Sequence, residues 1–171
     1  MKLKTAYMGL LCAAAIILGY IESLFPVFVG IPGMKIGLPN LAIIMVLYLY
    51  TWKEALAVSA ARILVIGFLF GNAFSIAFSL AGGILSLLCM ETAKKSGKMS
   101  CIGVSMVGGV AHNAGQILVA VLVVENIRVS YYFSVLAITG MITGIVIGIL
   151  GGTLTERISR SVIGKDRSSK K

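Results

Sequence analysis

The feature that most constrains this chain is a succession of apolar stretches, separated from one another by turn residues or by clusters of charge. A helix needs roughly 20 apolar residues to cross about 30 Å of hydrocarbon, and most of these stretches have about that length. The composition agrees, since the 171 residues are 58% hydrophobic and only 12% charged, with a mean hydropathy of +1.02. The lipid bilayer is therefore the solvent in which this chain is expected to fold.

Six stretches predict six membrane helices. They are Ala6–Phe25, Leu38–Tyr50, Lys53–Phe70, Asn72–Ala93, Ile102–Val124 and Ser130–Leu154. The second is short for a full crossing, so we expect it to be tilted, interrupted or extended by the loop before it. The predicted fold class is an all-α integral membrane protein, a six-transmembrane-helix bundle. Residues 1–155 are predicted to form one domain and residues 156–171 a basic tail, because no long linker separates the spans.

Lysines and arginines predict the orientation of the bundle. Twelve of the fifteen lie at the N-terminus, at Lys53, between residues 94 and 98, or in the tail. An even number of crossings places all twelve on one side, which the positive-inside rule identifies as the cytoplasm. We therefore expect cytoplasmic termini in a multi-pass protein of a bacterial cell membrane. Charge distributed in this way does not indicate nucleic-acid binding.

Arg62 is the informative cation, because it alone lies well inside a predicted span. A charge at membrane depth costs at least about 2.5 kcal/mol on insertion scales, so its side chain should face the protein interior or a wet cavity. One interpretation is a ligand for an anion or carboxylate. The other is a structural pair with Glu22 or a cap on backbone carbonyls.

Further polar candidates follow the first helix. Glu22 lies near its outer end, and the stretch from residue 26 to 40 is rich in glycine and proline, including Lys35 and Asn40. Irregular backbone of this kind could line an extracytoplasmic cavity, with Lys35 as a cation and Asn40 as donor and acceptor. The alternative is an ordinary solvated hairpin with a lysine at the lipid headgroups.

The fifth segment holds a polar group near its middle. His112, Asn113 and Gln116 lie within about one and a half helical turns, and His112 and Gln116 share one face. Interhelical hydrogen bonding is the alternative to ligand binding. A lone histidine without carboxylates or thiols at ligand spacing does not indicate a metal site. Asn72 lies at the outer turn before the fourth segment. It is predicted to line the opening of the same extracytoplasmic cavity.

Small residues on the first segment, Gly9, Ala13 and Ala15, suit tight helix contacts and predict either internal packing or docking of another membrane subunit. The chain contains no phosphate-binding loop, and its single aspartate, Asp166, cannot form a cluster that holds magnesium against a diphosphate. We therefore predict no catalytic residues, no cofactor and no metal.

Several stretches taken together resemble the Gx transporter family over roughly residues 6 to 155. They are Ile21–Ser23 through Pro26, Pro32–Leu41, Arg62, Gly71–Asn72 and Gly108–Gln116. The resemblance implies a relative of the substrate-binding S components of energy-coupling factor (ECF) transporters. These have a six-helix membrane fold, an outward-opening site under the first external loop, and small residues on the first helix that contact a coupling subunit. Members are also labelled heptaprenyl diphosphate synthase component I.

The main hypothesis is a subunit that captures an anionic vitamin-like or metabolite ligand and depends on ECF-type coupling and ATPase subunits for uptake. Its predicted site is Glu22, Lys35, Asn40, Arg62, Asn72, His112, Asn113 and Gln116, with Gly9, Ala13 and Ala15 as the docking face. The alternative is the non-catalytic membrane component of a heptaprenyl diphosphate synthase, a partner of the catalytic prenyl synthase. A stand-alone carrier would need a relay through Glu22 and His112.

Overall fold

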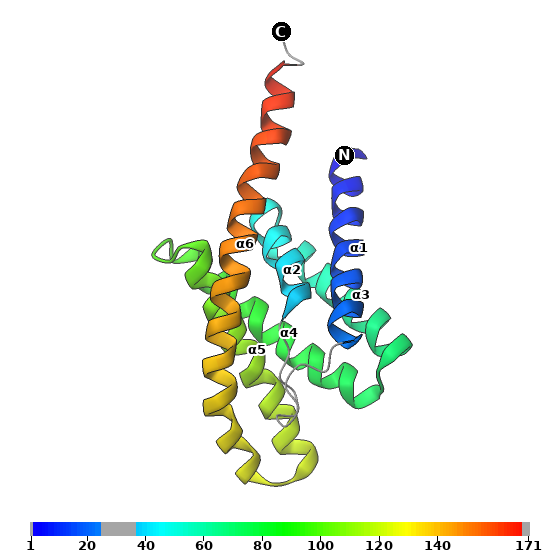
Figure 1. Ribbon diagram of the computed structural model, residues 1–171, viewed down its shortest axis with the longest axis vertical. Helices are drawn as coiled ribbons and strands as arrows, with labels where there is room; N and C mark the ends of the chain where they lie inside the picture. The colour runs from blue at the N-terminus through cyan, green and yellow to red at the C-terminus, as the bar shows by residue number, and fades with distance from the viewer. Residues whose placement is uncertain (1, 25–36, 169–171) are drawn as a thin grey trace.

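The computed structural model describes residues 2–24 and 37–168, and over these residues the chain is helical without strands (Figure 1). The helices are α1 (Lys2–Leu24), α2 (Leu38–Leu49), α3 (Trp52–Phe70), α4 (Ala73–Lys95), α5 (Cys101–Val124), the 3-10 helix η1 (Ile127–Tyr132) and α6 (Phe133–Ser168). Each of the six predicted stretches is thus helical over its described residues. The last one differs most, because it continues to Ser168 although its apolar pattern indicated an end near Leu154.

Four segments are long and apolar enough to cross a membrane by length and composition, namely Lys4–Leu24, Ala73–Lys95, Cys101–Val124 and Ile127–Arg160. The remaining two helices differ from ordinary spans for separate reasons. α2 has only 12 residues, and the 19 residues of α3 include three charges, Lys53, Glu54 and Arg62. Length and composition therefore support four of the six predicted crossings.

Three of the α-helices begin where a side chain can satisfy the first backbone N–H groups. Thr51 and Glu54 form a capping box at α3, the Asn72 side chain accepts from the Ser75 N–H at α4, and the Ser100 side chain accepts from the Gly103 N–H at α5. α2 begins differently, with Gly37 in the left-handed region at φ 79°. A residue with a Cβ adopts that conformation with strain, so glycine suits this position.

The helices pack in two groups around α2. α5 packs along both α4 and α6, whereas α1 packs on α2 and α3. Both termini lie towards one end of the molecule and the η1 connection lies at the other (Figure 1). The short α2 is the most enclosed helix, with Pro39 and all six residues from Ala42 to Leu47 buried.

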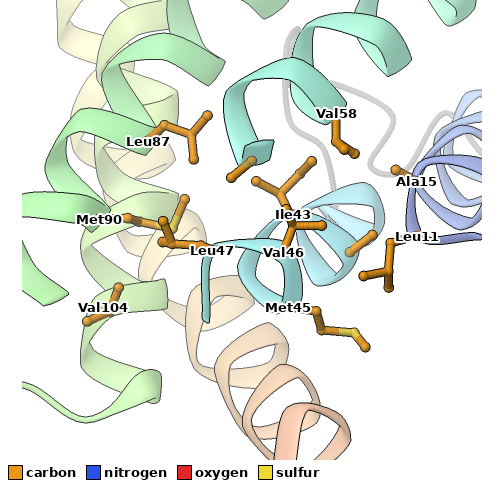
Figure 2. Close-up of a cluster of buried hydrophobic side chains, with 12 residues drawn as sticks. Leu11, Ala15, Ile43, Met45, Val46, Leu47, Val58, Leu87, Met90 and Val104 are labelled. Carbon is orange, nitrogen blue, oxygen red and sulfur yellow. The ribbon is translucent and has the colours of Figure 1, made fainter. Parts of the chain in front are cut away.

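A core of apolar side chains joins these groups. Ile43, Val46 and Leu47 of α2 lie between α1 on one side and α4 on the other, as Figure 2 shows. Ala15 of α1 is fully buried in this core. The apolar cluster occupies the half of the bundle nearer the termini, since Leu11, Met90 and Val104 also belong to it. The polar residues Glu22, Asn40 and His112 lie in the other half of the bundle, further from the termini.

Candidate functional site

A small polar cavity lies among the helices. It has a volume of about 30 Å³ and is lined by Glu22, Gly37, Pro39, Asn40, Arg62, Ser79, Gly109, His112, Asn113 and Thr143. Each of the six α-helices supplies at least one of these residues. A second cavity of about 20 Å³ adjoins it and shares Gly37, Asn40, Gly109 and Thr143. The two spaces are large enough for single waters.

Arg62 brings a positive charge into this cavity from α3. Its Nη2 donates to Asn40 Oδ1 at 3.2 Å, whereas its buried Nε has no hydrogen-bond partner among residues 2–24 and 37–168. Within the described part of the chain, no carboxylate forms an ion pair with the guanidinium. Arg62 and Glu22 therefore form no direct ion pair, although the Glu22 carboxylate acts electrostatically on the guanidinium from within the same cavity. A guanidinium has five N–H donors, so Arg62 keeps donor capacity for another acceptor.

Glu22 lies in the same cavity but has a different partner. Its carboxylate accepts the backbone N–H of Gly37, and the Gly37 carbonyl in turn accepts from the Asn40 N–H at 2.9 Å. The end of α1 is thereby tied to the first turn of α2. Since Asn40 also accepts from Arg62, one chain of hydrogen bonds connects α1, α2 and α3.

Of the three polar residues of α5, two line the cavity and the third packs against a neighbouring helix. His112 and Asn113 line the cavity, and Asn113 Nδ2 also donates to the Leu136 carbonyl of α6 at 2.5 Å. Gln116 is only 1% exposed and is not among the lining residues. It lies against Gly82 of α4, where an added Cβ would be 2.9 Å from Gln116 Cγ and 3.0 Å from His112 Cε1. The predicted shared face of His112 and Gln116 is thus present, and it packs on α4.

Other predicted residues lie elsewhere. Asn72 is exposed and caps α4 instead of lining the cavity, and Lys35 lies outside the described residues. On α1, Gly9 and Ala13 are exposed, whereas Ala15 is 0% exposed and packs internally. The cavity therefore gathers five of the eight predicted site residues.

Two hydroxyl residues of the cavity, Ser79 and Thr143, were missed from the sequence. Each is a polar residue inside an apolar helix, which was the available signal. That signal is weak, because such hydroxyls commonly bond to the preceding turn of their own helix. Thr143 Oγ1 does so, donating to the Thr139 carbonyl at 3.0 Å.

This arrangement can bind an anion by electrostatics and hydrogen bonds. The guanidinium supplies charge, and the neighbouring amide and imidazole groups supply further polar contacts. Among residues 2–24 and 37–168, no three His, Cys, Asp or Glu side chains are grouped so that they could hold a metal ion. Among the described residues, the cavity thus offers one buried cation, the Glu22 carboxylate that accepts from Gly37, and neutral polar groups.

Apolar helices long enough to span a bilayer, combined with a charged residue in a cavity that they enclose, define a helical membrane protein with an internal polar site. The family model described as heptaprenyl diphosphate synthase component I matches residues 11–154, and the chain belongs to this family. No curated protein and no solved structure matches it. The match confirms the family label that the sequence motifs indicated.

Proposed function

We propose that this chain is a non-catalytic membrane subunit that binds an anionic small molecule beside Arg62, and that it acts as component I of a heptaprenyl diphosphate synthase. The family match supports the second part of this proposal, since its name describes one component of a synthase. In this proposal all six helices lie in the membrane, and residues 1–155 form one domain. The catalytic chemistry belongs to a separate prenyl synthase subunit.

The observation that carries the proposal is that the buried Arg62 guanidinium has a hydrogen-bond donor, Nε, without an acceptor in the described part of the chain. A guanidinium inside a membrane bundle is costly unless its charge and donors are satisfied. Here one donor meets Asn40, Glu22 acts on the charge without a direct ion pair, and Nε meets no acceptor among the described residues. A phosphate or carboxylate on a ligand would supply both charge and acceptors. The unused donor capacity of Arg62 is therefore explained by an anionic ligand.

A non-catalytic role is supported by the distribution of carboxylates. Magnesium bound to a diphosphate is held by carboxylate groups, and the single aspartate, Asp166, lies far along the chain from the residues of the cavity. Glu22 is the one carboxylate among the lining residues, and its carboxylate accepts from Gly37. The binding of a diphosphate here would rest on Arg62 and neutral groups.

A second candidate function, a substrate-capture subunit for ECF-type uptake, is favoured by the polarity of the cavity. Seven of its ten described lining residues have polar or charged side chains, which suits a water-soluble anion better than a prenyl tail. The exposed small residues Gly9 and Ala13 on α1 would permit close approach of a coupling subunit. This candidate predicts partners that include ATPases.

Binding measurements on Arg62 variants test the shared part of both candidates. The purified full chain would be titrated with inorganic diphosphate and with heptaprenyl diphosphate, using wild type, Arg62→Lys, Arg62→Gln and the exposed-site control Arg128→Gln. Loss of a charge-assisted contact of about 1.5 to 3 kcal/mol should weaken binding about 10- to 100-fold in Arg62→Gln. Arg128→Gln should bind as wild type does. Equal affinity of folded Arg62→Gln would refute an anion site at Arg62.

Native mass spectrometry of the protein purified gently from its host separates the two candidates. Retention of a soluble prenyl synthase, together with binding of heptaprenyl diphosphate, supports the component I role. Retention of a membrane coupling subunit with ATPases, together with a water-soluble anion, supports the uptake role and refutes the first.

A further inference from the structure

A second site lies at the end of the molecule that holds the termini, well apart from the cavity beside Arg62. It is an open groove of about 400 Å³ between the α2–α3 turn and the last turns of α4. The groove is lined by Tyr50, Thr51, Trp52, Lys53, Glu91 and Lys94. None of these residues lines the cavity beside Arg62, so the groove is independent of the function proposed above.

The lysines of the groove are placed to receive an anion. Lys94 Nζ donates to the Leu47 carbonyl at 2.6 Å and lies 5.1 Å from the centre of the Tyr48 ring. These contacts hold its ammonium in place while leaving two of its three donors for other acceptors. Lys53 is exposed and, within the described part of the chain, has no carboxylate at ion-pair distance. One cation is thus fixed and the other is available.

The carboxylates near the groove are neutralised by other lysines. Glu91 pairs with Lys95 at 3.2 Å, and Glu54 pairs with Lys4 at 2.5 Å. Lys4 also lies 5.4 Å from the centre of the Tyr50 ring, at the edge of the groove. The charge left in the groove is therefore positive.

The surroundings of the groove favour a lipid as the source of the anion. Tyr50 and Trp52 are residue types that occupy the boundary between hydrocarbon and water. On α4, Ile84, Leu88 and Glu91 recur on one helix face, so an exposed apolar track leads directly into the groove. Ile84 is 47% exposed and Leu88 is 51% exposed. An amphiphile could place acyl chains along this track and its charged end among the lysines.

We propose that this groove binds the phosphate of an anionic membrane lipid through Lys53 and Lys94, with the acyl chains lying along Ile84 and Leu88 of α4. Polybasic ends of membrane helices attract anionic lipids generally by about 1 kcal/mol per lysine. The groove should bind one lipid more specifically than this general attraction does. A lysine held in place, aromatic side chains and an exposed apolar track meet there.

The test is native mass spectrometry of the full chain after delipidation, with added phosphatidylglycerol or phosphatidylcholine. Wild type is expected to retain phosphatidylglycerol in preference to phosphatidylcholine. Lys53→Gln should reduce this retention about fivefold, which corresponds to the contribution of one lysine. Lys98→Gln is the matched control, because it removes the same charge from an exposed position in the α4–α5 loop, outside the groove lining. Thermal unfolding verifies that each variant is folded.

Three outcomes would overturn the proposal. Equal losses in Lys53→Gln and Lys98→Gln, or equal retention of the two lipids, would mean that net charge alone attracts lipid. Glycerol 3-phosphate tests the source of the phosphate, since it lacks acyl chains. If it displaces phosphatidylglycerol at equal concentration, the groove binds a free phosphate compound instead of a lipid. Reduced phosphatidylglycerol retention in Leu88→Ser supports the acyl track.

Discussion

Gly109 of α5 and Gly140 of α6 are in direct backbone contact, because a Cβ built on either residue would collide with the carbonyl oxygen of the other. The contact continues along α6, where a Cβ on Gly144 would be 2.7 Å from Met106 Cα and one on Gly148 would be 2.6 Å from Ile102 Cα. In lipid, where apolar surface gains little from burial, such close packing holds helices together. This glycine seam also places Gly109 and Asn113 at the cavity.

Substitution in the seam should destabilise the bundle. In Gly140→Ala the new methyl group would meet Gly109 backbone and, at 2.8 Å, the Asn113 amide nitrogen, so the helices must separate. The expected cost is about 1 to 3 kcal/mol, typical of overpacking. Gly9→Ala is the control, since no atom of the described residues lies within 4 Å of its added Cβ. Thermal unfolding in detergent should show a lower Tm for Gly140→Ala and an unchanged Tm for Gly9→Ala. Equal Tm values for the two variants would contradict a stabilising role of the glycine seam.

Asn113 should contribute to stability through α6. Its hydrogen bond of 2.5 Å to the Leu136 carbonyl joins α5 to α6, and interhelical bonds of this kind contribute about 0.6 kcal/mol, with a maximum near 1.7. Asn113→Ala should lower the free energy of unfolding by about that amount. If unfolding is unchanged while anion binding is lost, the side chain serves the ligand instead of the helix contact.

Stability should depend on pH through the pair that joins α1 to α3. The hydrogen bond from Lys4, followed by that from Thr51, lowers the pKa of Glu54 from 4.5 to about 2. Because the folded-state pKa is the lower one, this stabilisation is complete above about pH 4.5 and is lost as the pH falls towards 2. Glu54 lies in the first turn of α3, next to Lys53 and paired with the exposed Lys4, at the polar end of that helix.

Glu54→Gln removes this titrating group, so its Tm should fall less than that of wild type between about pH 5 and pH 2.5. Glu156→Gln is the matched control, since it removes the same charge from an exposed pair with Arg160 on α6. Identical pH profiles for the two variants would contradict a specific contribution from Glu54.

The orientation in the membrane is tested by labelling intact cells with a membrane-impermeant maleimide. Cys12, Cys89 and Cys101 would first be replaced by alanine, after which Lys98→Cys or Tyr131→Cys is introduced at exposed positions. Since most basic residues lie at the end that holds the termini, only Tyr131→Cys should react in intact cells. Both should react after permeabilisation. Labelling of Lys98→Cys alone in intact cells would reverse the predicted topology.

Much of the fold could be predicted because apolar runs bounded by turn residues are a strong signal. The second predicted helix, Leu38–Tyr50, differs from α2 by one residue, and the third, Lys53–Phe70, differs from α3 by one. The end of α6 could not be predicted from hydropathy. Polar residues after Leu154 are compatible with a helix in water, so the loss of the apolar pattern marks a change of solvent and not of conformation.

The site could be predicted in part. Arg62, Glu22 and Asn40 share the cavity because a buried charge must face polar groups. That rule can be applied to the sequence alone. The positions of Asn72 and Gln116 depend on local geometry. Asn72 caps the helix that follows it, and the face of Gln116 is set by how closely Gly82 lets α4 approach α5. Hydropathy carries no information on such contacts.

The volume of the cavity beside Arg62 has a thermodynamic consequence for the proposed ligand. A space of about 30 Å³ has the size of a water, so the larger ligand proposed above would bind a conformation in which the lining helices stand further apart. The apparent dissociation constant is then the intrinsic one divided by the open fraction, and an open population of about 1% weakens binding about 100-fold. At high ligand concentration, association proceeds at the rate of opening. The helix contacts therefore determine how often a ligand is admitted.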